Sequence, residues 1–180
     1  MNIIKYFNRH TVYLLNVFQS VLVFYLKEID MSYTRCLYHV IFRTKFSQLT
    51  LPVGPDKELY NYIAGIARNK RCVPYQINGM PDHVHILASL APVIAVADFV
   101  KEVKNATSVW LKGRRDLFPY FSGWAVGYAG LSYSEEAIPN ISEYILTQKE
   151  HHMRLSFHDE LRKLLDAEHI DIDENYFLKD

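Results

Sequence analysis

Two histidines, a tyrosine and a glutamine carry most of the chemistry that this sequence suggests. His83 and His85 are separated by one apolar residue, so on a strand their side chains point to the same face. Tyr144 and Gln148 are four residues apart and share one face of a helix. These groups can form a site in which a divalent metal lies beside a tyrosine nucleophile. Such a combination suits the cutting and rejoining of a phosphodiester backbone.

The metal in this hypothesis is held by His83, His85 and Gln148, with Tyr144 as the nucleophile. Two imidazoles and an amide oxygen can bind magnesium or manganese, and the ligand types alone do not decide which. Asp82 precedes the first histidine and points to the opposite strand face, which favours a supporting role. Each pattern also has an ordinary explanation, because most histidine pairs of this spacing are plain strand residues, Tyr144 can be core and Gln148 can face solvent.

The elements that must position these residues follow from hydrophobic periodicity and turn signals. Asn78-Gly79 predicts a turn before the strand that carries the histidines. Pro139 disfavours a helical Ile138, so the tyrosine helix is expected to begin near Ile141. Strands are predicted at 36–44, 73–77, 83–90 and 124–133, and helices at 57–69, 97–111, 141–154 and 156–168. The order βαββαβ followed by helices predicts an α+β fold: a ferredoxin-like antiparallel sheet with helices on one face, plus C-terminal helices.

The domain organisation is simple apart from the start of the chain. Residues 31–180 are expected to form a single domain, and residues 1–30 an N-terminal extension of doubtful status, since Met31 directly precedes the first strand pattern. The apolar run 12–26 is shorter than the ~20 residues of a membrane span. That length leads us to expect no membrane partner. Cys36 and Cys72 form no CxxC motif and are expected to be free thiols, which favours a reducing cytoplasm.

Charge is segregated along a chain whose formal net charge is zero. Residues 31–120 hold 12 lysines and arginines against 6 aspartates and glutamates, whereas residues 121–180 hold 5 against 12. The part of the chain that bears the histidines is therefore basic and can attract phosphates. An alternative explains the charge segregation about equally well: the charged residues lie on solvent-exposed helix faces, and their uneven distribution along the chain is accidental.

Several segments match the pattern of one known family. They are Tyr38-His39, Thr44-Lys45, residues 79–87 around the two histidines, Lys104 with Ser108, Gly127-Tyr128, Ser132, Ser134 and residues 144–152 around Tyr144. Over about residues 32–177 the chain resembles the single-tyrosine HUH transposases of small bacterial insertion sequences and their relatives, the REP-associated tyrosine transposases.

This resemblance implies roles for particular residues and partners. His83, His85 and Gln148 would be metal ligands and Tyr144 the nucleophile that forms a covalent 5′-phosphotyrosine link. It also implies single-stranded DNA with hairpins as substrate and a homodimer, in which the tyrosine helix acts in its own subunit or in its neighbour. The residues expected near the DNA are Tyr38, His39, Arg43, Lys45 and Lys104.

Three alternatives to an active transposase stay open at the level of sequence. A domesticated relative would use the same site on chromosomal repeat hairpins. A catalytically silent DNA-binding protein would keep the fold and the basic surface, although the intact set of four residues argues against it. A small metal-binding ferredoxin-like domain without DNA affinity would explain the neutral net charge, and its binding would not depend on salt.

Overall fold

The computed structural model describes residues 33–151, 156–175 and 177–180. The expected N-terminal extension and its apolar run therefore lie outside the described residues, as does the end of the predicted tyrosine helix at 152–154. None of the helices in the described part of the chain combines the length and the apolarity that crossing a membrane requires.

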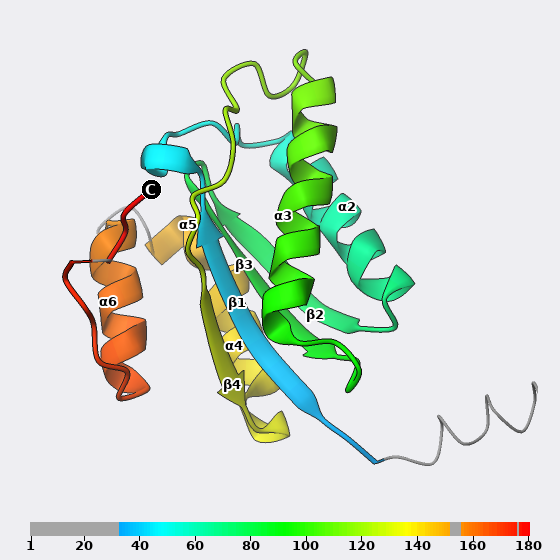
Figure 1. The fold of residues 1–180 in the computed structure, drawn as a ribbon, viewed down its shortest axis with the longest axis vertical. Helices are drawn as coiled ribbons and strands as arrows, with labels where there is room; N and C mark the ends of the chain where they lie inside the picture. The colour runs from blue at the N-terminus through cyan, green and yellow to red at the C-terminus, as the bar shows by residue number, and fades with distance from the viewer. Residues whose placement is uncertain (1–32, 152–155, 176) are drawn as a thin grey trace, which may run out of the picture. The chain divides into compact units, whose positions relative to one another are not determined.

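A four-stranded antiparallel sheet forms the centre of the unit that begins at Arg35 (Figure 1). Its strands are β1 (Cys36–Arg43), β2 (Val73–Met80), β3 (His83–Leu90) and β4 (Ala129–Tyr133), and they lie side by side in the order β2-β3-β1-β4. Helix α2 (Asp56–Asn69) connects β1 to β2, and α3 (Val96–Gly113) connects β3 to β4. The predicted βαββαβ order and the ferredoxin-like sheet are confirmed.

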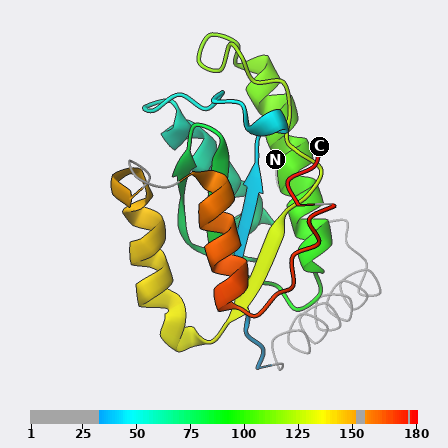
Figure 2. The same ribbon diagram turned by 90° about the vertical axis from the view of Figure 1, so that its left-hand side faces the viewer.

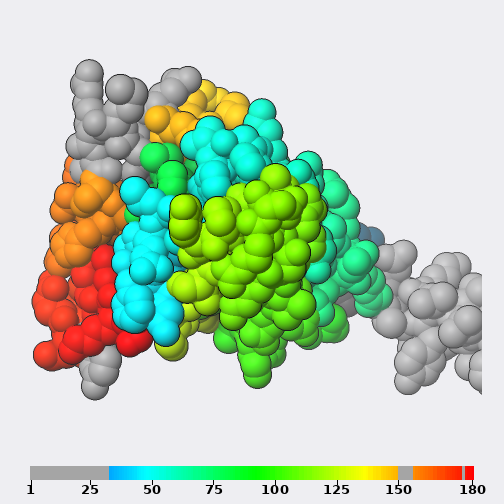
Figure 3. Space-filling model, turned by 90° about the horizontal axis from the view of Figure 1, so that it is seen from above, coloured from blue at the N-terminus to red at the C-terminus, as the bar shows by residue number. Residues whose placement is uncertain are grey.

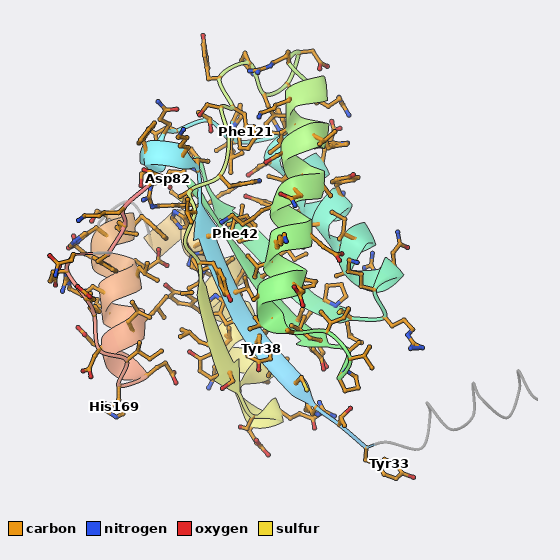
Figure 4. The ribbon with its side chains drawn as sticks, in the orientation of Figure 1. Tyr33, Tyr38, Phe42, Asp82, Phe121 and His169 are labelled. Atoms are coloured by element: carbon orange, nitrogen blue, oxygen red, sulfur yellow. The ribbon has the colours of Figure 1, made fainter. Side chains whose placement is uncertain are left out.

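Helices α2 and α3 cover one face of the sheet and enclose the main apolar core. Strand alternation sends Val40 and Phe42 of β1, and Val84 and Ile86 of β3, to this face. Figure 4 shows Phe42 between β1 and α3. Their partners from the two helices recur at helical spacing and include Leu59, Ile63, Phe99 and Val103.

Three C-terminal helices cover the opposite face (Figure 2). They are α4 (Ile138–Leu146), α5 (Gln148–His151) and α6 (Phe157–Ala167). Ile145 of α4 packs on Leu37 and Leu87, and a second small cluster joins Ile41 to the apolar residues of α6. Ser156 caps α6, because its hydroxyl accepts a hydrogen bond from the Asp159 backbone N–H. Short 3₁₀ turns occupy Lys45–Ser47 (η2) and Glu135–Ala137 (η3).

The predicted turn at Asn78-Gly79 is wrong. Strand β2 continues to Met80, and the turn falls at Pro81 and Asp82. Gly79 instead pairs with Val84 across the hairpin, where a Cβ would collide with the carbonyl oxygen of His83. The glycine is therefore explained by a close approach of two backbones rather than by a turn.

The predicted tyrosine helix differs in its start and in its continuity. Ile138 is already helical, and Pro139 lies in the first turn, where its missing N–H costs no hydrogen bond. The helix then ends at Leu146, Thr147 leaves helical geometry at φ −89° and ψ 7°, and α5 begins at Gln148. Tyr144 and Gln148 therefore lie on two consecutive helices rather than on one.

The predicted last strand is shorter than expected. Strand β4 begins at Ala129, whereas Trp124 forms only an isolated bridge with Thr44. The carbonyl oxygens of residues 125–127 accept hydrogen bonds from Lys104 instead of pairing in the sheet. This segment is thus held by a side chain of α3.

Candidate metal centre and nucleophile

Strand β3 brings His83 and His85 to the face that α4, α5 and α6 cover. Both side chains are fully buried, and their ring centroids lie 5.0 Å apart. The residues between and after them, Val84 and Ile86, point into the apolar core on the other face. The alternation of a single strand therefore separates the polar pair from the core.

Each histidine has a partner at its Nδ1 atom. The Nδ1 of His83 lies 2.7 Å from the Oδ1 of Asp82, and the Nδ1 of His85 lies 2.9 Å from the Nε2 of His39. A carboxylate can only accept, so the bond to Asp82 places a proton on Nδ1 of His83. Metal-binding histidines commonly have their second nitrogen fixed in this way. Asp82 therefore contacts the buried histidine pair, whereas the sequence predicted that it points to the opposite strand face; a supporting role for it stays a prediction.

Glu160 of α6 lies in front of the two rings. Its Oε2 is 3.4 Å from the Nε2 of His83, and its Oε1 is 3.6 Å from the Nε2 of His85. One ligand atom from each of the three residues lies within 4.8 Å of the others. The ring of Phe157, one turn earlier in α6, stacks on His83 with centroids 4.4 Å apart. Helix α6 thus closes over the histidine pair.

Tyr144 and Gln148 meet at the same carboxylate. The Tyr144 hydroxyl donates a hydrogen bond to Oε1 of Glu160, and the Nε2 of Gln148 donates to the same oxygen at 2.7 Å. The tyrosine ring also stands edge-on to His85, with centroids 6.1 Å apart. The structure therefore brings together the four residues that the sequence singled out, despite the break at Thr147.

The residues present fit a divalent cation. Gln148 is 1% exposed, and its Oε1 has no hydrogen-bond partner among the described residues. Ligands about 2.1 Å from one ion lie roughly 3.0–3.4 Å from each other, close to the separations between Glu160 and the two imidazoles. Imidazole nitrogens with amide and carboxylate oxygens form a donor set that suits divalent ions.

Burial governs the acid–base state of the site. It lowers the pKa of the His39 imidazole to about 4, against the opposing charge of Glu160, so His39 is neutral near pH 7. Burial also lowers the pKa of His83, but the hydrogen bonds to Asp82 and Glu160 outweigh it, and the net shift is upward. The pKa of the Tyr144 phenol is raised, mainly by burial and to a smaller extent by the negative charge of Glu160. The phenol of Tyr144 is therefore held in its protonated form next to an acceptor, the carboxylate of Glu160.

The end of α4 is anchored to the sheet, and α5 is anchored to α2. The amide Nδ2 of Asn78 donates to the carbonyl oxygens of Ile145 and Leu146, at 2.9 and 3.1 Å. The ammonium group of Lys149 forms an ion pair with the buried carboxylate of Asp56, at the start of α2. Carbonyls at a helix end need such donors, and both contacts lie next to Tyr144 and Gln148. They fix the position of these two side chains over the histidines.

Comparison with known proteins assigns this chain to a family. Residues 32–148 match the family model described as "Transposase IS200 like", which spans more than half of the chain. The chain belongs to the IS200-like transposase family. It is 31% identical over 120 residues to the ISDra2 transposase TnpA of Deinococcus radiodurans, a match that covers 62% of this chain and 82% of that protein.

Two solved structures are similar to this chain. The crystal structure of a candidate transposase from Deinococcus radiodurans matches with a TM-score of 0.52 and 28% identity, over 66% of this chain and 94% of that one. A REP-associated tyrosine transposase, solved bound to a REP hairpin, matches with a TM-score of 0.52 over 67% of this chain and 71% of that one. At 12% identity the second likeness shows the fold alone.

Two of the residues expected near the DNA are covered. His39 is 1% exposed and lies behind His85, where it orients that ring. Arg43 is 4% exposed, and its guanidinium donates to the carbonyl oxygen of Leu178 and to the carboxylate of Asp180. Figure 3 shows these C-terminal residues (red) against the segment that follows β1 (cyan). Neither side chain is presented at the surface in this arrangement.

The other three differ in their surroundings. Lys104 donates to three carbonyl oxygens of residues 125–127, which uses all the donors of its ammonium group. Tyr38 is half-buried and packs against the main core, on the face away from the histidines. Lys45 is exposed, with its ammonium 5.0 Å from the ring of Phe46. Of the five, only Lys45 is exposed.

Sequence reasoning missed Glu160. The residue lies in the predicted last helix, at a position that shares one face with Phe157, Leu161 and Leu164. A carboxylate within an apolar helix stripe is costly to bury unless it has partners. An acidic residue on the apolar face of a predicted helix was therefore the feature of the sequence that could have pointed to Glu160.

Proposed function

We propose that this protein nicks and rejoins single-stranded DNA, through a covalent 5′-phosphotyrosine link to Tyr144 and with a divalent metal held at His83, His85 and Gln148. The observation that carries this proposal is the meeting of Tyr144 and Gln148 at the carboxylate that also faces both histidines. Magnesium or manganese bound there would neutralise the charge on the scissile phosphate.

The chemistry is a balanced exchange of phosphodiester bonds. The Tyr144 oxygen forms a bond to phosphorus, and the bond from phosphorus to the 3′-oxygen of the neighbouring nucleotide breaks, leaving a free 3′-hydroxyl. Attack by a 3′-hydroxyl on the phosphotyrosine reverses the step and restores the phenol, so no net hydrolysis is required. The phenolic proton is already directed to a carboxylate oxygen by the hydrogen bond of Tyr144. The residues thus supply a nucleophile whose position is fixed before DNA binds.

Single-stranded DNA that carries hairpins is the substrate we propose. The REP-associated relative was solved with a REP hairpin, and residues 31–120 of this chain carry the excess of positive charge that phosphate binding requires. A homodimer is part of the same proposal and is checked by the mass of the protein in solution. The alternative, a catalytically silent hairpin-binding protein, would have no need of the assembled site.

The test is formation of a covalent adduct. The purified protein is incubated with Mg²⁺ or Mn²⁺ and labelled single strands taken from the DNA that flanks its own gene. We expect a protein–DNA adduct that survives denaturation and requires the metal, the single strand and Tyr144. Tyr144→Phe, His83→Ala and duplex DNA are the controls. Salt-sensitive binding without an adduct would favour the silent alternative, and an adduct that persists in Tyr144→Phe would contradict the proposed nucleophile.

A further inference from the structure

We infer that Glu160 is an additional ligand of the metal and the residue that sets the position of the Tyr144 hydroxyl relative to it. This inference rests on the proposed function, because it assumes a metal at the histidine pair. It adds a residue of the last helix to a centre that the sequence assigned to β3 and to the segment of Tyr144 and Gln148.

The position of Glu160 is that of a ligand. Its two oxygens lie 3.4 and 3.6 Å from the Nε2 atoms of His83 and His85, and the carboxylate is 3% exposed. The Nδ1 atoms of both rings are engaged elsewhere, by Asp82 and His39, so the Nε2 atoms converge on this carboxylate. Two histidines and one carboxylate hold a divalent ion on one side and leave positions open for substrate.

Charge supports the same assignment. With two neutral imidazoles and an amide alone, the protein would provide no negative charge to a doubly charged ion. Glu160 supplies one, and a carboxylate oxygen is a preferred ligand of magnesium and manganese. Among the described residues, no other carboxylate joins the two histidines in a cluster of this kind.

The same carboxylate connects the ion to the nucleophile. Oε1 accepts the hydrogen bonds of Tyr144 and Gln148, while Oε2 is the oxygen nearer to His83. A group that is bound to the metal and to the phenol at once holds the two at a fixed separation, which favours in-line attack on a phosphate bound at the ion. For Tyr144, Glu160 is therefore a positioning residue.

Glu160 lies outside the part of the chain that the family model matches. That match ends at residue 148, at Gln148 itself, and α6 begins nine residues later. Nothing in the match therefore assigns a role to Glu160. Phe157, which stacks on His83, and Leu161, which packs on Ile41, dock α6 on the sheet and bring the carboxylate to the site.

The test measures metal binding by the full-length chain without DNA. Isothermal titration of chelator-treated protein with Mn²⁺ compares the wild type with Glu160→Ala, Glu160→Gln and Asp166→Asn, the last a matched control at an exposed acidic position of α6. We expect Glu160→Ala to weaken Mn²⁺ binding at least tenfold, Glu160→Gln to be intermediate, and the control to stay within twofold. Tyr144→Phe should bind Mn²⁺ within about threefold of the wild type, because it removes a hydrogen bond and no ligand.

The outcomes separate this inference from the proposed function. If the wild type binds Mn²⁺ and forms the adduct but folded Glu160→Ala or Glu160→Gln binds Mn²⁺ equally well, the inference is overturned and the proposed function stands. Faster adduct formation by either variant at unchanged affinity would overturn it too, since α6 would then obstruct the site. A wild type with neither Mn²⁺ affinity nor adduct would overturn both. If Glu160→Ala fails to fold, Glu160→Gln decides, because it keeps the shape of the side chain.

Discussion

On one face of the sheet, β3 presents Val84, Ile86 and Ala88 to α2 and α3, and these residues lie in a continuous apolar core. On the other face the same strand presents His83 and His85, which meet a carboxylate, an amide and a phenol from α4, α5 and α6. Buried apolar groups stabilise the fold, whereas buried polar groups are costly unless they are paired. The first face therefore stabilises the fold through apolar burial, whereas the second buries polar groups that contact one another.

The largest expected effect comes from the polar face. Replacing His85 with alanine removes a proposed ligand, so adduct formation should fall by at least about a thousandfold. The main core does not contain His85, so the variant should still unfold cooperatively and lose less stability than a variant of the apolar face. Adduct yield against time, measured with thermal unfolding on the same preparation, checks both. If His85→Ala retained more than a tenth of the wild-type rate of adduct formation, the polar face would not have the role that distinguishes it from the apolar face.

The next effect comes from the neighbouring residue on the apolar face. Ile86 is fully buried, and Ile86→Ala leaves a cavity between β3 and the helices. The free energy of unfolding should fall by about 2–5 kcal/mol. Because no atom of Ile86 belongs to the proposed site, the folded protein should retain its rate of adduct formation within about threefold. Urea unfolding and the adduct assay at low temperature measure the two quantities. A large loss of rate with little loss of stability would show that the two faces are not separate.

A smaller effect is expected where the two regions are joined. Asn78→Ala removes the amide that donates to the carbonyl oxygens of Ile145 and Leu146. The free energy of unfolding should fall by about 1 kcal/mol. Adduct formation should slow by about tenfold, because the end of the helix that carries Tyr144 is less well held. The control is Asn61→Ala, at an exposed position of α2. Equal rates in the two variants would exclude a positioning role for Asn78.

The sheet and its first two helices could be predicted because their residues repeat with clear periods. Alternation in β1 and β3 and the helical spacing of α2 and α3 both reflect one buried face per element. The same alternation placed His83 and His85 on one face. Local patterns failed where tertiary contacts decide. Gly79 serves a close backbone approach, and Pro139 is tolerated in a first helical turn.

The surroundings of the site could not be predicted in the same way. His39, Arg43 and Lys104 are polar residues that sequence assigns to a surface, yet each is bound to a group distant in the chain. Glu160 is twelve residues from Gln148, and only the packing of α6 on β1 brings it to the histidines. Such long-range pairs leave a weak local signal, here a single acid in an apolar helix stripe.

The central claim is that the polar face of the sheet holds a metal beside a nucleophilic Tyr144. The most direct test is mass-spectrometric mapping of the covalent adduct after proteolysis, with Mn²⁺ present and with a chelator. The account predicts a 5′-phosphate-linked nucleotide on the peptide that contains Tyr144, and only in the presence of the metal. A nucleotide on another tyrosine, or on Tyr144 regardless of metal, would contradict it.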